Sequence, residues 1–287
     1  MKKAALLIIF FFPVLICWGG EENQQTPTSP GKEVPVRSDR GAQDRYLYES
    51  PVVSYFSIPP HIFLDKDKKV TGAIYDLIED SIAPEIGVKF QWETEPTSPA
   101  RQFHNLKDKN NRVLCLAVYV PARRDFMIYS KEPYYYAQSI IAVHKSNPLK
   151  VVNEASDISN MVFGYSQKAY ITPFMRDPSI QFDLISSPDF LEINLKKVMA
   201  HRIDGIYSPG KASSIFFLKK FGVIDDFRLI DLPEKPTPLY FGFSKGNKML
   251  ADEFDQAFER LGGQQLYVKL LSRYIDISKL EHVSEKP

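Results

Sequence analysis

The residues best suited to bind a charged solute lie in one stretch, where two arginines and a run of tyrosines stand before an apolar segment. Arg123 and Arg124 are followed, after a Ser-Lys-Glu-Pro break at 130–133, by three tyrosines at 134–136. The planar guanidinium group of arginine donates two parallel hydrogen bonds to a carboxylate. Tyrosine rings supply flat walls for a small-molecule pocket. The stretch therefore predicts a site for a small anionic solute, although an Arg–Arg pair by itself is more often a solvated surface feature.

The first residues have the pattern of an export signal. Lys2 and Lys3 precede an unbroken apolar run over 4–16, which is short for a hydrocarbon core of about 30 Å but typical of a signal peptide. We predict a signal peptide over residues 1–19, with cleavage after Gly19. The alternative is a lipid on Cys17, because Val-Leu-Ile-Cys at 14–17 resembles a bacterial lipobox in all but its bulky isoleucine.

A polar segment over residues 20–46 follows, with almost no apolar side chain to bury, and predicts a disordered linker. Such a linker suits a membrane tether and is equally an ordinary disordered terminus. We therefore expect a periplasmic or otherwise extracytoplasmic protein, either free or anchored through Cys17.

Composition excludes several classes of function. The formal net charge is +1 and acidic and basic residues alternate along the chain, so no basic face for nucleic acid is expected. Beyond the leader the sequence has one cysteine, Cys115, inside an apolar run. It is expected to be an inert core residue that forms no disulfide within the mature chain. The sequence shows no second apolar span of membrane length.

The body of the chain alternates strand-like and helix-like segments, which predicts an α/β fold with parallel strands and helices on both faces of each sheet. We expect two lobes of similar size. The first comprises 47–137 plus 245–287 and the second 138–244, with two hinge crossings between them. In such sheets a ligand binds beyond the carboxyl ends of the strands.

Four blocks, taken together, resemble a known family. They are Pro-Pro-His-Ile-Phe-Leu-Asp at 59–65 with Thr-Gly-Ala-Ile-Tyr-Asp-Leu at 71–77, the arginine–tyrosine stretch at 123–136, His-Arg-Ile-Asp-Gly-Ile at 201–206, and Gly-Gly-Gln-Gln-Leu-Tyr at 262–267 with Ser-Arg-Tyr at 272–274. In this order and spacing they resemble the extracytoplasmic solute-binding proteins of ABC transporters, family 3, which includes the binders of polar amino acids. The likeness covers roughly 52–276.

The resemblance implies a two-lobe clamp of the periplasmic type II kind, which closes on a small solute and passes it to an ABC permease in the inner membrane. It implies that Arg123 binds the carboxylate of the solute, that the protein is a monomer, and that it needs no cofactor. Arg124 is expected to face solvent or to pair with Asp125.

Three positions depart from the amino acid binders of that family. Val120 stands where a Thr or Ser is common, Ile58 where an aromatic residue often covers the ligand, and Pro209 where an Asp holds the α-ammonium. A buried ammonium without a partner is costly. A carboxylate or another small polar or aromatic solute therefore fits this sequence better than an ordinary α-amino acid, and the identity of the solute stays open.

Further candidates lie where strands and helices are expected to end. The ligand-binding candidates besides Arg123 are Tyr55, Phe56, Arg101, Tyr134, Tyr165, Ser166, Tyr207 and Ser208. For Tyr55 and Phe56, packing in the core is an equal alternative. For Arg101, the alternative is an exposed side chain beside Glu95. The five histidines, at 61, 104, 144, 201 and 282, have no metal-ligand spacing, so no metal site is expected.

The sequence does not favour an enzyme. It contains no nucleophile elbow, no phosphate-binding glycine loop and no supported Cys-His pair. A periplasmic dehydratase of this fold needs a carboxylic acid in its site, for which Glu132 is the nearby candidate. A second alternative is a sensing or scaffold protein that keeps the clamp but does not serve transport.

Overall fold

The computed structural model describes residues 50–108, 111–167, 169–187 and 189–280. All of them belong to one compact unit of the chain, 40–287. The predicted signal peptide over 1–19, the candidate lipidation residue Cys17, and the linker over 20–46 lie outside the described residues, as does His282.

The first lobe is built on a mixed sheet. Among the described residues this sheet has six strands: β4, β1, β5, β13 and β6 in this order, with β7 also paired to β13. Their bounds are β1 Val52–Ser54, β4 Gln91–Trp92, β5 Arg112–Val118, β6 Met127–Tyr129, β7 Tyr135–Ala137 and β13 Thr237–Ser244. β1 runs parallel to β4 and β5, as the alternation of elements predicts, whereas β13 is antiparallel to β5, β6 and β7.

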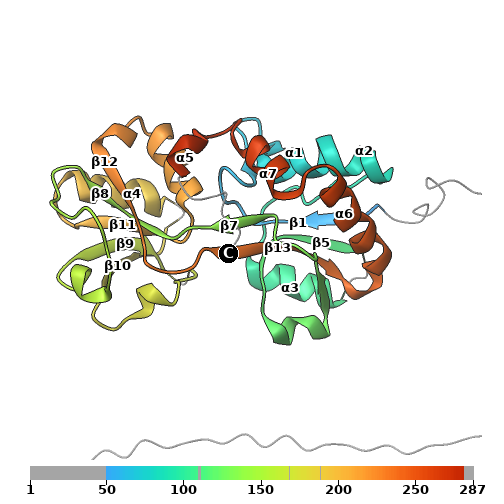
Figure 1. The fold of residues 1–287 in the computed structure, drawn as a ribbon, viewed down its shortest axis with the longest axis horizontal. Coiled ribbons are helices and arrows are strands. Elements are labelled where there is room, and N and C mark those ends of the chain that lie inside the picture. Colours follow the sequence, from blue (N-terminus) through green and yellow to red (C-terminus); the bar gives the residue numbers. More distant parts are fainter. Residues whose placement is uncertain (1–49, 109–110, 168, 188, 281–287) are drawn as a thin grey trace, which may run out of the picture. The chain divides into compact units, whose positions relative to one another are not determined.

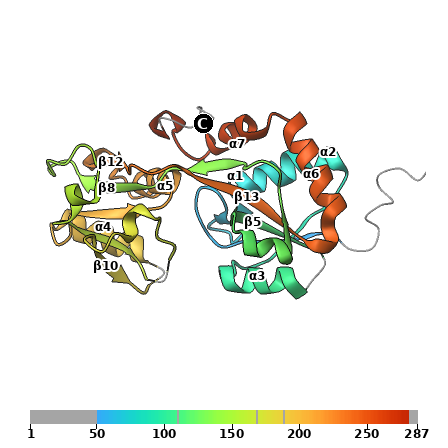
Figure 2. The same cartoon turned by 60° about the horizontal axis from the view of Figure 1, so that its bottom comes forward.

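Helices cover both faces of this sheet (Figures 1 and 2). Their bounds are α1 Ala73–Asp76, α2 Ala83–Ile86, α3 Pro99–Asp108, α6 Lys248–Arg260 and α7 Gly263–Leu271. Alternate residues of β5 point to opposite faces, so Val113 and Cys115 lie in the large core with α6 and α7, while Leu114 packs with Leu106 of α3. A short hairpin of β2 (Phe63–Leu64) and β3 (Val70–Thr71) precedes α1.

The helical segment over 73–86 is continuous although it contains a proline. α1 and α2 are joined by a π-helical turn over Leu77–Ile82, which ends just before Pro84. Proline lacks the amide proton that would continue the α-helical ladder, so irregular hydrogen bonding in the preceding turn is its expected effect. Gly87 then ends the helix in the left-handed conformation, φ 67°, as the sequence predicts.

The second lobe has its own sheet. Its strand order in the described part of the chain is β10, β9, β11, β8 and β12. The bounds are β8 Ile140–His144, β9 Val162–Ser166, β10 Gln181–Ile185, β11 Gly205–Ser208 and β12 Phe227–Asp231, with α4 Phe190–Met199 and α5 Lys211–Lys220. Two buried clusters lie in this lobe. Gly164 of β9 leaves room for the buried Asn194 of α4, whose amide carbon would lie 2.4 Å from a Cβ at that position.

Two crossings join the sheets, one between β7 and β8 and one between β12 and β13 (Figure 1). Residues 237–244, placed in the second lobe by the sequence analysis, form β13 and pair with strands of the first sheet. The second crossing therefore lies between residues 232 and 236.

Hydrogen bonds tie the two crossings to each other. The Leu232 amide donates to the Ser139 carbonyl (3.0 Å), and Gln138 Nε2 donates to the Leu232 carbonyl (3.1 Å). The Glu234 carboxylate accepts from the Ser139 hydroxyl and, through Oε2, from the Phe174 amide at 3.2 Å. Glu234 thus connects both crossings with the segment that follows β9.

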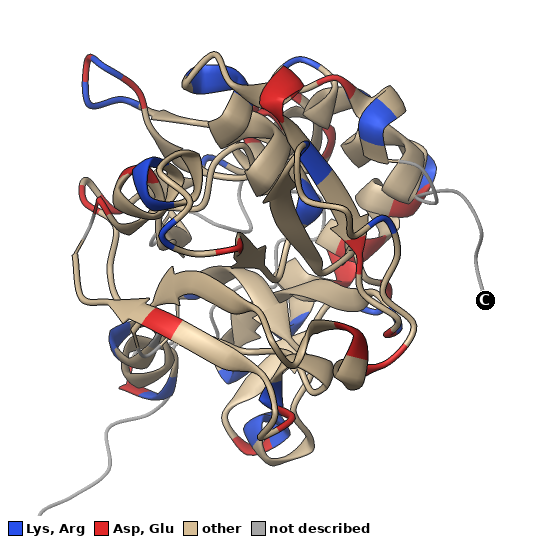
Figure 3. Cartoon of the chain, turned by 90° about the vertical axis from the view of Figure 1, so that its left-hand side faces the viewer, with Lys and Arg blue, Asp and Glu red and all other residues tan. Residues whose placement is uncertain are grey.

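The second-lobe helix α5 also contacts the first lobe. Ala212 and Ile215 are buried in the large core of the first lobe, and the Phe216 ring lies 5.3 Å from that of Phe63 in β2. Within the described ranges, none of the helices combines the length and apolarity needed to span a membrane. Basic and acidic residues are interspersed in the view of Figure 3, as expected for a chain of balanced charge.

Glu234→Ala is expected to lower the free energy of unfolding by about 1.5–3 kcal/mol, because two donors lose a charged acceptor. Urea denaturation measures the change. Glu192→Ala is the matched control, since Glu192 forms a half-exposed i,i+4 pair with Lys196 and is expected to cost about 0.5 kcal/mol or less. Equal effects of the two variants would contradict the role of Glu234 at the crossings.

His61 provides a test of the first-lobe core. Its Nδ1 lies 2.6 Å from the Tyr267 hydroxyl, the two rings stack, and burial lowers the pKa of His61 to about 4. Between pH 6.5 and 4 the unfolded chain binds a proton at this residue and the folded chain does not, so folding stability falls as the pH is lowered.

His61→Gln removes the titrating ring, so the stability of this variant is expected to fall less than that of the wild type between pH 7 and 4.5. Thermal unfolding followed at several pH values measures the difference. His104→Gln, which removes a histidine on the exposed side of α3, serves as control, and its pH dependence should lie closer to that of the wild type than the pH dependence of His61→Gln does. A wild-type-like dependence in His61→Gln would count against this assignment.

Lys68 occupies a glycine-like position in the β2–β3 turn. It has φ 58°, and its amide donates to the Asp65 carbonyl at 3.1 Å. A side chain in the left-handed region costs free energy that glycine avoids. Lys68→Gly is therefore expected to raise the free energy of unfolding by about 0.5–1 kcal/mol, measured by urea denaturation. Lys66→Gly, in the same turn, should be neutral or destabilising.

Candidate functional site

The carboxyl ends of the parallel strands bring several candidate segments together at one edge of each sheet. In the first sheet Tyr55 follows β1 and Tyr119 follows β5. In the second sheet Gln167 follows β9 and Pro209 follows β11. In open α/β sheets this edge is where ligands bind, so the side chains there form the candidate site.

Arg123 lies in a turn of 3-10 helix, Pro121–Asp125, directly after β5. Its guanidinium carbon is 4.0 Å from the centre of the Phe103 ring of α3, and its Nη1 donates to the Val118 carbonyl at 3.3 Å. The group is half-buried and held on the ring face. The rest of its fork has no partner among the described residues and is available to an anion. Arg124 and Asp125 are exposed.

Three tyrosines surround the same strand end. The ring of Tyr119 lies 5.0 Å from that of Tyr129 and 6.4 Å from that of Tyr240, and the last two are 6.0 Å apart. Tyr129 Oη accepts from the Val120 amide at 3.0 Å and can donate to the Val118 carbonyl at 3.3 Å. Sequence reasoning missed this cluster, because its members come from the residue after β5 and from β6 and β13.

Other first-lobe candidates are less accessible. Tyr55 and Tyr134 have no exposed surface, and Tyr134 packs between Phe241 and Tyr267 with ring distances of 4.6 and 4.8 Å. Burial raises the pKa of Tyr55 to about 12. These two tyrosines therefore build the first-lobe core, which is the alternative that the sequence left open for Tyr55. Phe56 is partly buried against the same core.

Arg101 lies in the first turn of α3 and is exposed. Its amide meets the Ser98 hydroxyl at 3.4 Å, so Ser98 caps the helix as its sequence position predicts. The exposure of Arg101 agrees with the alternative that the sequence left open for this residue.

The second-lobe candidates organise the segment after β9. Tyr165 Oη donates to the Tyr170 carbonyl at 2.7 Å, and Tyr207 Oη accepts from the Thr172 amide at 2.9 Å. Both tyrosines are buried, with rings 4.7 Å apart, and burial raises the pKa of Tyr207 to about 12. Through these hydrogen bonds the two tyrosines hold residues 170–172 at this edge of the second sheet.

The two second-lobe serines differ in exposure. The Ser208 hydroxyl bonds to the Gly210 carbonyl at 3.0 Å and is buried, whereas Ser166, at the end of β9, is partly exposed. Ser166 is therefore the more accessible of the two to a solute at this edge.

Few acidic groups are available at this edge of the second lobe. The Asp231 carboxylate pairs with Lys211 Nζ at 2.8 Å, and Glu234 is engaged at the crossings. Pro209 offers no side-chain acceptor. In the described part of the chain no group of His, Cys, Asp and Glu residues has the arrangement of a metal site.

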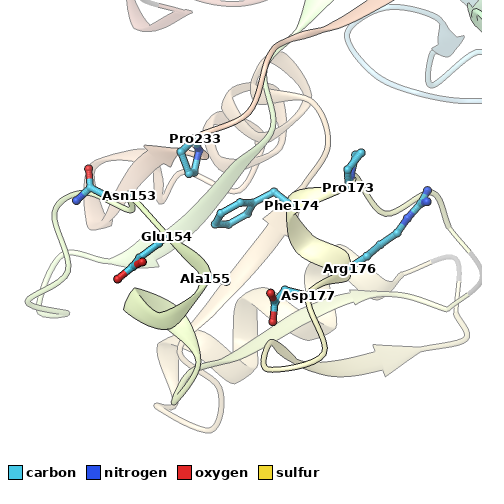
Figure 4. Close-up of a pocket in the computed structure, with 8 residues that line it drawn as sticks. All are labelled: Asn153, Glu154, Ala155, Pro173, Phe174, Arg176, Asp177 and Pro233. Atoms are coloured by element: carbon cyan, nitrogen blue, oxygen red, sulfur yellow. The ribbon is translucent and has the colours of Figure 1, made fainter.

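A separate open hollow of about 520 Å³ lies in the second lobe (Figure 4). Asn153, Glu154, Ala155, Pro173, Phe174, Arg176, Asp177 and Pro233 line it. The Phe174 ring points toward Glu154, whereas the Arg176 side chain runs in the opposite direction (Figure 4). Arg176 Nε is bonded to the Ile171 carbonyl, and Asp177 to Ser179. The hollow contains none of the predicted ligand residues.

Solved structures with the same fold include several amino acid-binding proteins. An ancestral cationic amino acid solute-binding protein superposes with a TM-score of 0.66 at 19% identity, covering 82% of this chain and 100% of that one. An ancestral arginine-binding protein bound to arginine has a TM-score of 0.59 at 19% identity, with 78% and 97% covered.

The substrate-binding domain 2 of GlnP from Lactococcus lactis, in the open conformation, has a TM-score of 0.59 at 18% identity, with 78% of this chain and 94% of that chain covered. At such identities these likenesses establish the fold, the two-lobe clamp of type II periplasmic binding proteins, and not the ligand.

A comparison with curated proteins finds no match. The family model of the bacterial extracellular solute-binding proteins, family 3, matches residues 52–277. This range covers both sheets, both crossings and the arginine at the end of β5. The chain therefore belongs to the bacterial extracellular solute-binding proteins of family 3.

Proposed function

We propose that this protein captures a small carboxylate-bearing solute outside the cytoplasmic membrane and delivers it to an ABC permease. The observation that carries the proposal is the position of Arg123, at the carboxyl end of β5, with its guanidinium held on the Phe103 ring and most of its donors available. A charge-assisted bidentate pair is the strongest recognition that this side chain provides.

Delivery to a permease follows from the family and from the kind of proteins that share the fold. The structural neighbours include substrate-binding domains of amino acid ABC transporters. The two crossings permit hinge closure of the lobes around a solute. We further propose that residues 1–19 direct export, with lipid attachment at Cys17 as the alternative to a free protein, and that the protein acts as a monomer.

Binding rather than catalysis fits the chemistry at the edge. Glu132, the candidate acid of a dehydratase, is exposed. A general acid kept protonated at neutral pH needs a buried, apolar setting that raises its pKa. We therefore propose capture without chemical change.

Arg123→Gln is expected to reduce the effect of the solute on thermal stability. The purified protein is screened by thermal shift against amino acids, small carboxylates, amines and sugars, because a ligand that binds only the folded state raises the melting temperature. A carboxylate hit should lose affinity about tenfold or more in Arg123→Gln, since a charged hydrogen-bond pair is removed.

Arg124→Gln is the control, since Arg124 is the exposed neighbour in the same turn, and it should bind like the wild type. A hit that both variants keep would place the carboxylate elsewhere. Hits confined to sugars or amines would contradict a carboxylate-bearing solute.

A further inference from the structure

We propose that Tyr119, Tyr129 and Tyr240 form a subsite for a flat apolar group, so that the solutes of this protein are aryl carboxylates without an α-ammonium. The inference rests on the proposed function, in which Arg123 binds the carboxylate, and it names the solute class of that same site. We call these three residues the tyrosine subsite.

The tyrosine subsite presents one ring to solvent on a packed base. Tyr119 is 41% exposed, whereas Tyr129 and Tyr240 are only partly exposed and pack against its ring. The Tyr119 hydroxyl has no hydrogen-bond partner among the described residues. An exposed ring supported by two others offers a face on which a second aromatic group gains both apolar burial and a favourable ring–ring contact.

The subsite adjoins the Arg123 guanidinium. Arg123 Nη1 and Tyr129 Oη both lie 3.3 Å from the Val118 carbonyl oxygen. The two groups are therefore within two hydrogen-bond lengths of each other, at the end of β5. The Tyr119 ring, which is the exposed face of the subsite, packs 5.0 Å from the Tyr129 ring, centre to centre. A solute with its aromatic ring on Tyr119 and its carboxylate on Arg123 therefore needs a short aliphatic link between the two groups.

Both halves of the site are held in place before binding. Tyr129 Oη accepts from the Val120 amide at 3.0 Å, and the Arg123 guanidinium rests on Phe103. Tyr240 lies in β13, opposite Ala117 of β5, so sheet pairing fixes its position. Side chains that are already ordered lose little entropy when a ligand binds.

Three described carboxylates of the two lobes already have partners, and Pro209 offers no acceptor to an ammonium on the solute. Glu93 pairs with Arg112 at 2.9 Å, Asp231 with Lys211, and Glu234 with the crossings. Glu95, Asp125 and Glu132 are exceptions, because all three are exposed, so the experiment includes a solute with an α-ammonium.

The experiment measures the binding of 3-phenylpropanoate, butanoate and L-phenylalanine to the purified protein by isothermal titration calorimetry. 3-Phenylpropanoate is expected to bind more tightly than the other two. Tyr119→Ala should raise its dissociation constant roughly tenfold and leave that of butanoate unchanged, and Tyr119→Phe should restore binding. Phe221→Ala, which removes an exposed ring at the end of α5, should have no effect.

The outcomes separate the subsite from the proposed function. If Arg123→Gln weakens the binding of both carboxylates but Tyr119→Ala changes neither, the subsite is wrong and carboxylate capture stands. If L-phenylalanine binds as tightly as 3-phenylpropanoate, the exclusion of an ammonium is wrong. If no carboxylate binds, or Arg123→Gln leaves their binding unchanged, the proposed function itself is contradicted. Melting temperatures of the unliganded variants show that each is folded.

Discussion

The carboxylate of Glu234 holds together the three segments on which the geometry of the protein depends. It accepts hydrogen bonds from Ser139 in the first crossing and from Phe174 after β9, while its own backbone belongs to the second crossing. Tyr165 and Tyr207 fix the same segment after β9 through Tyr170 and Thr172. The candidate binding edge of the second lobe and the two crossings thus share one network of polar contacts.

Arg123 and the three tyrosines offer two kinds of interaction at the candidate edge of the first lobe, one ionic and one apolar. A surface ion pair is worth little, because water screens it. A guanidinium held on an aromatic face, with its donors directed at a carboxylate and less water around it, gains more from the same charges. Phe103 and the Val118 carbonyl hold the Arg123 guanidinium in place. In our proposal, the tyrosine subsite adds apolar contact where charge alone would not distinguish between carboxylates.

Local patterns predicted much of the fold. The sequence predicts the helix over 211–220 with the bounds that α5 has, and a strand over 113–118 that corresponds to β5. The predicted bounds agree less well with the structure for strands whose length depends on pairing with a neighbouring strand. The alternating segment Val-Lys-Phe-Gln-Trp at 88–92, which predicts a strand, yields only Gln91–Trp92 as β4, and β4 has β1 as its neighbour in the sheet. Strand β13 begins at Thr237 because β7 pairs with it there, and no pattern within 237–244 indicates that partner.

At the candidate site, too, local sequence patterns predicted some features and strand pairing decided the others. Residue type and position in the sequence placed Arg123 at the end of a strand, because strand, turn and arginine are neighbours along the chain. They did not show which tyrosines would be reachable: Tyr55 and Tyr134 became core, while Tyr119, Tyr129 and Tyr240 came together at the edge. The alternation of elements and the family blocks thus determined the fold class from sequence alone, and they indicated the residue that we propose to bind the anion. Which rings meet was decided only by the pairing of β13 with β5 and β6, because burial and ring contacts depend on neighbours that are distant in the sequence.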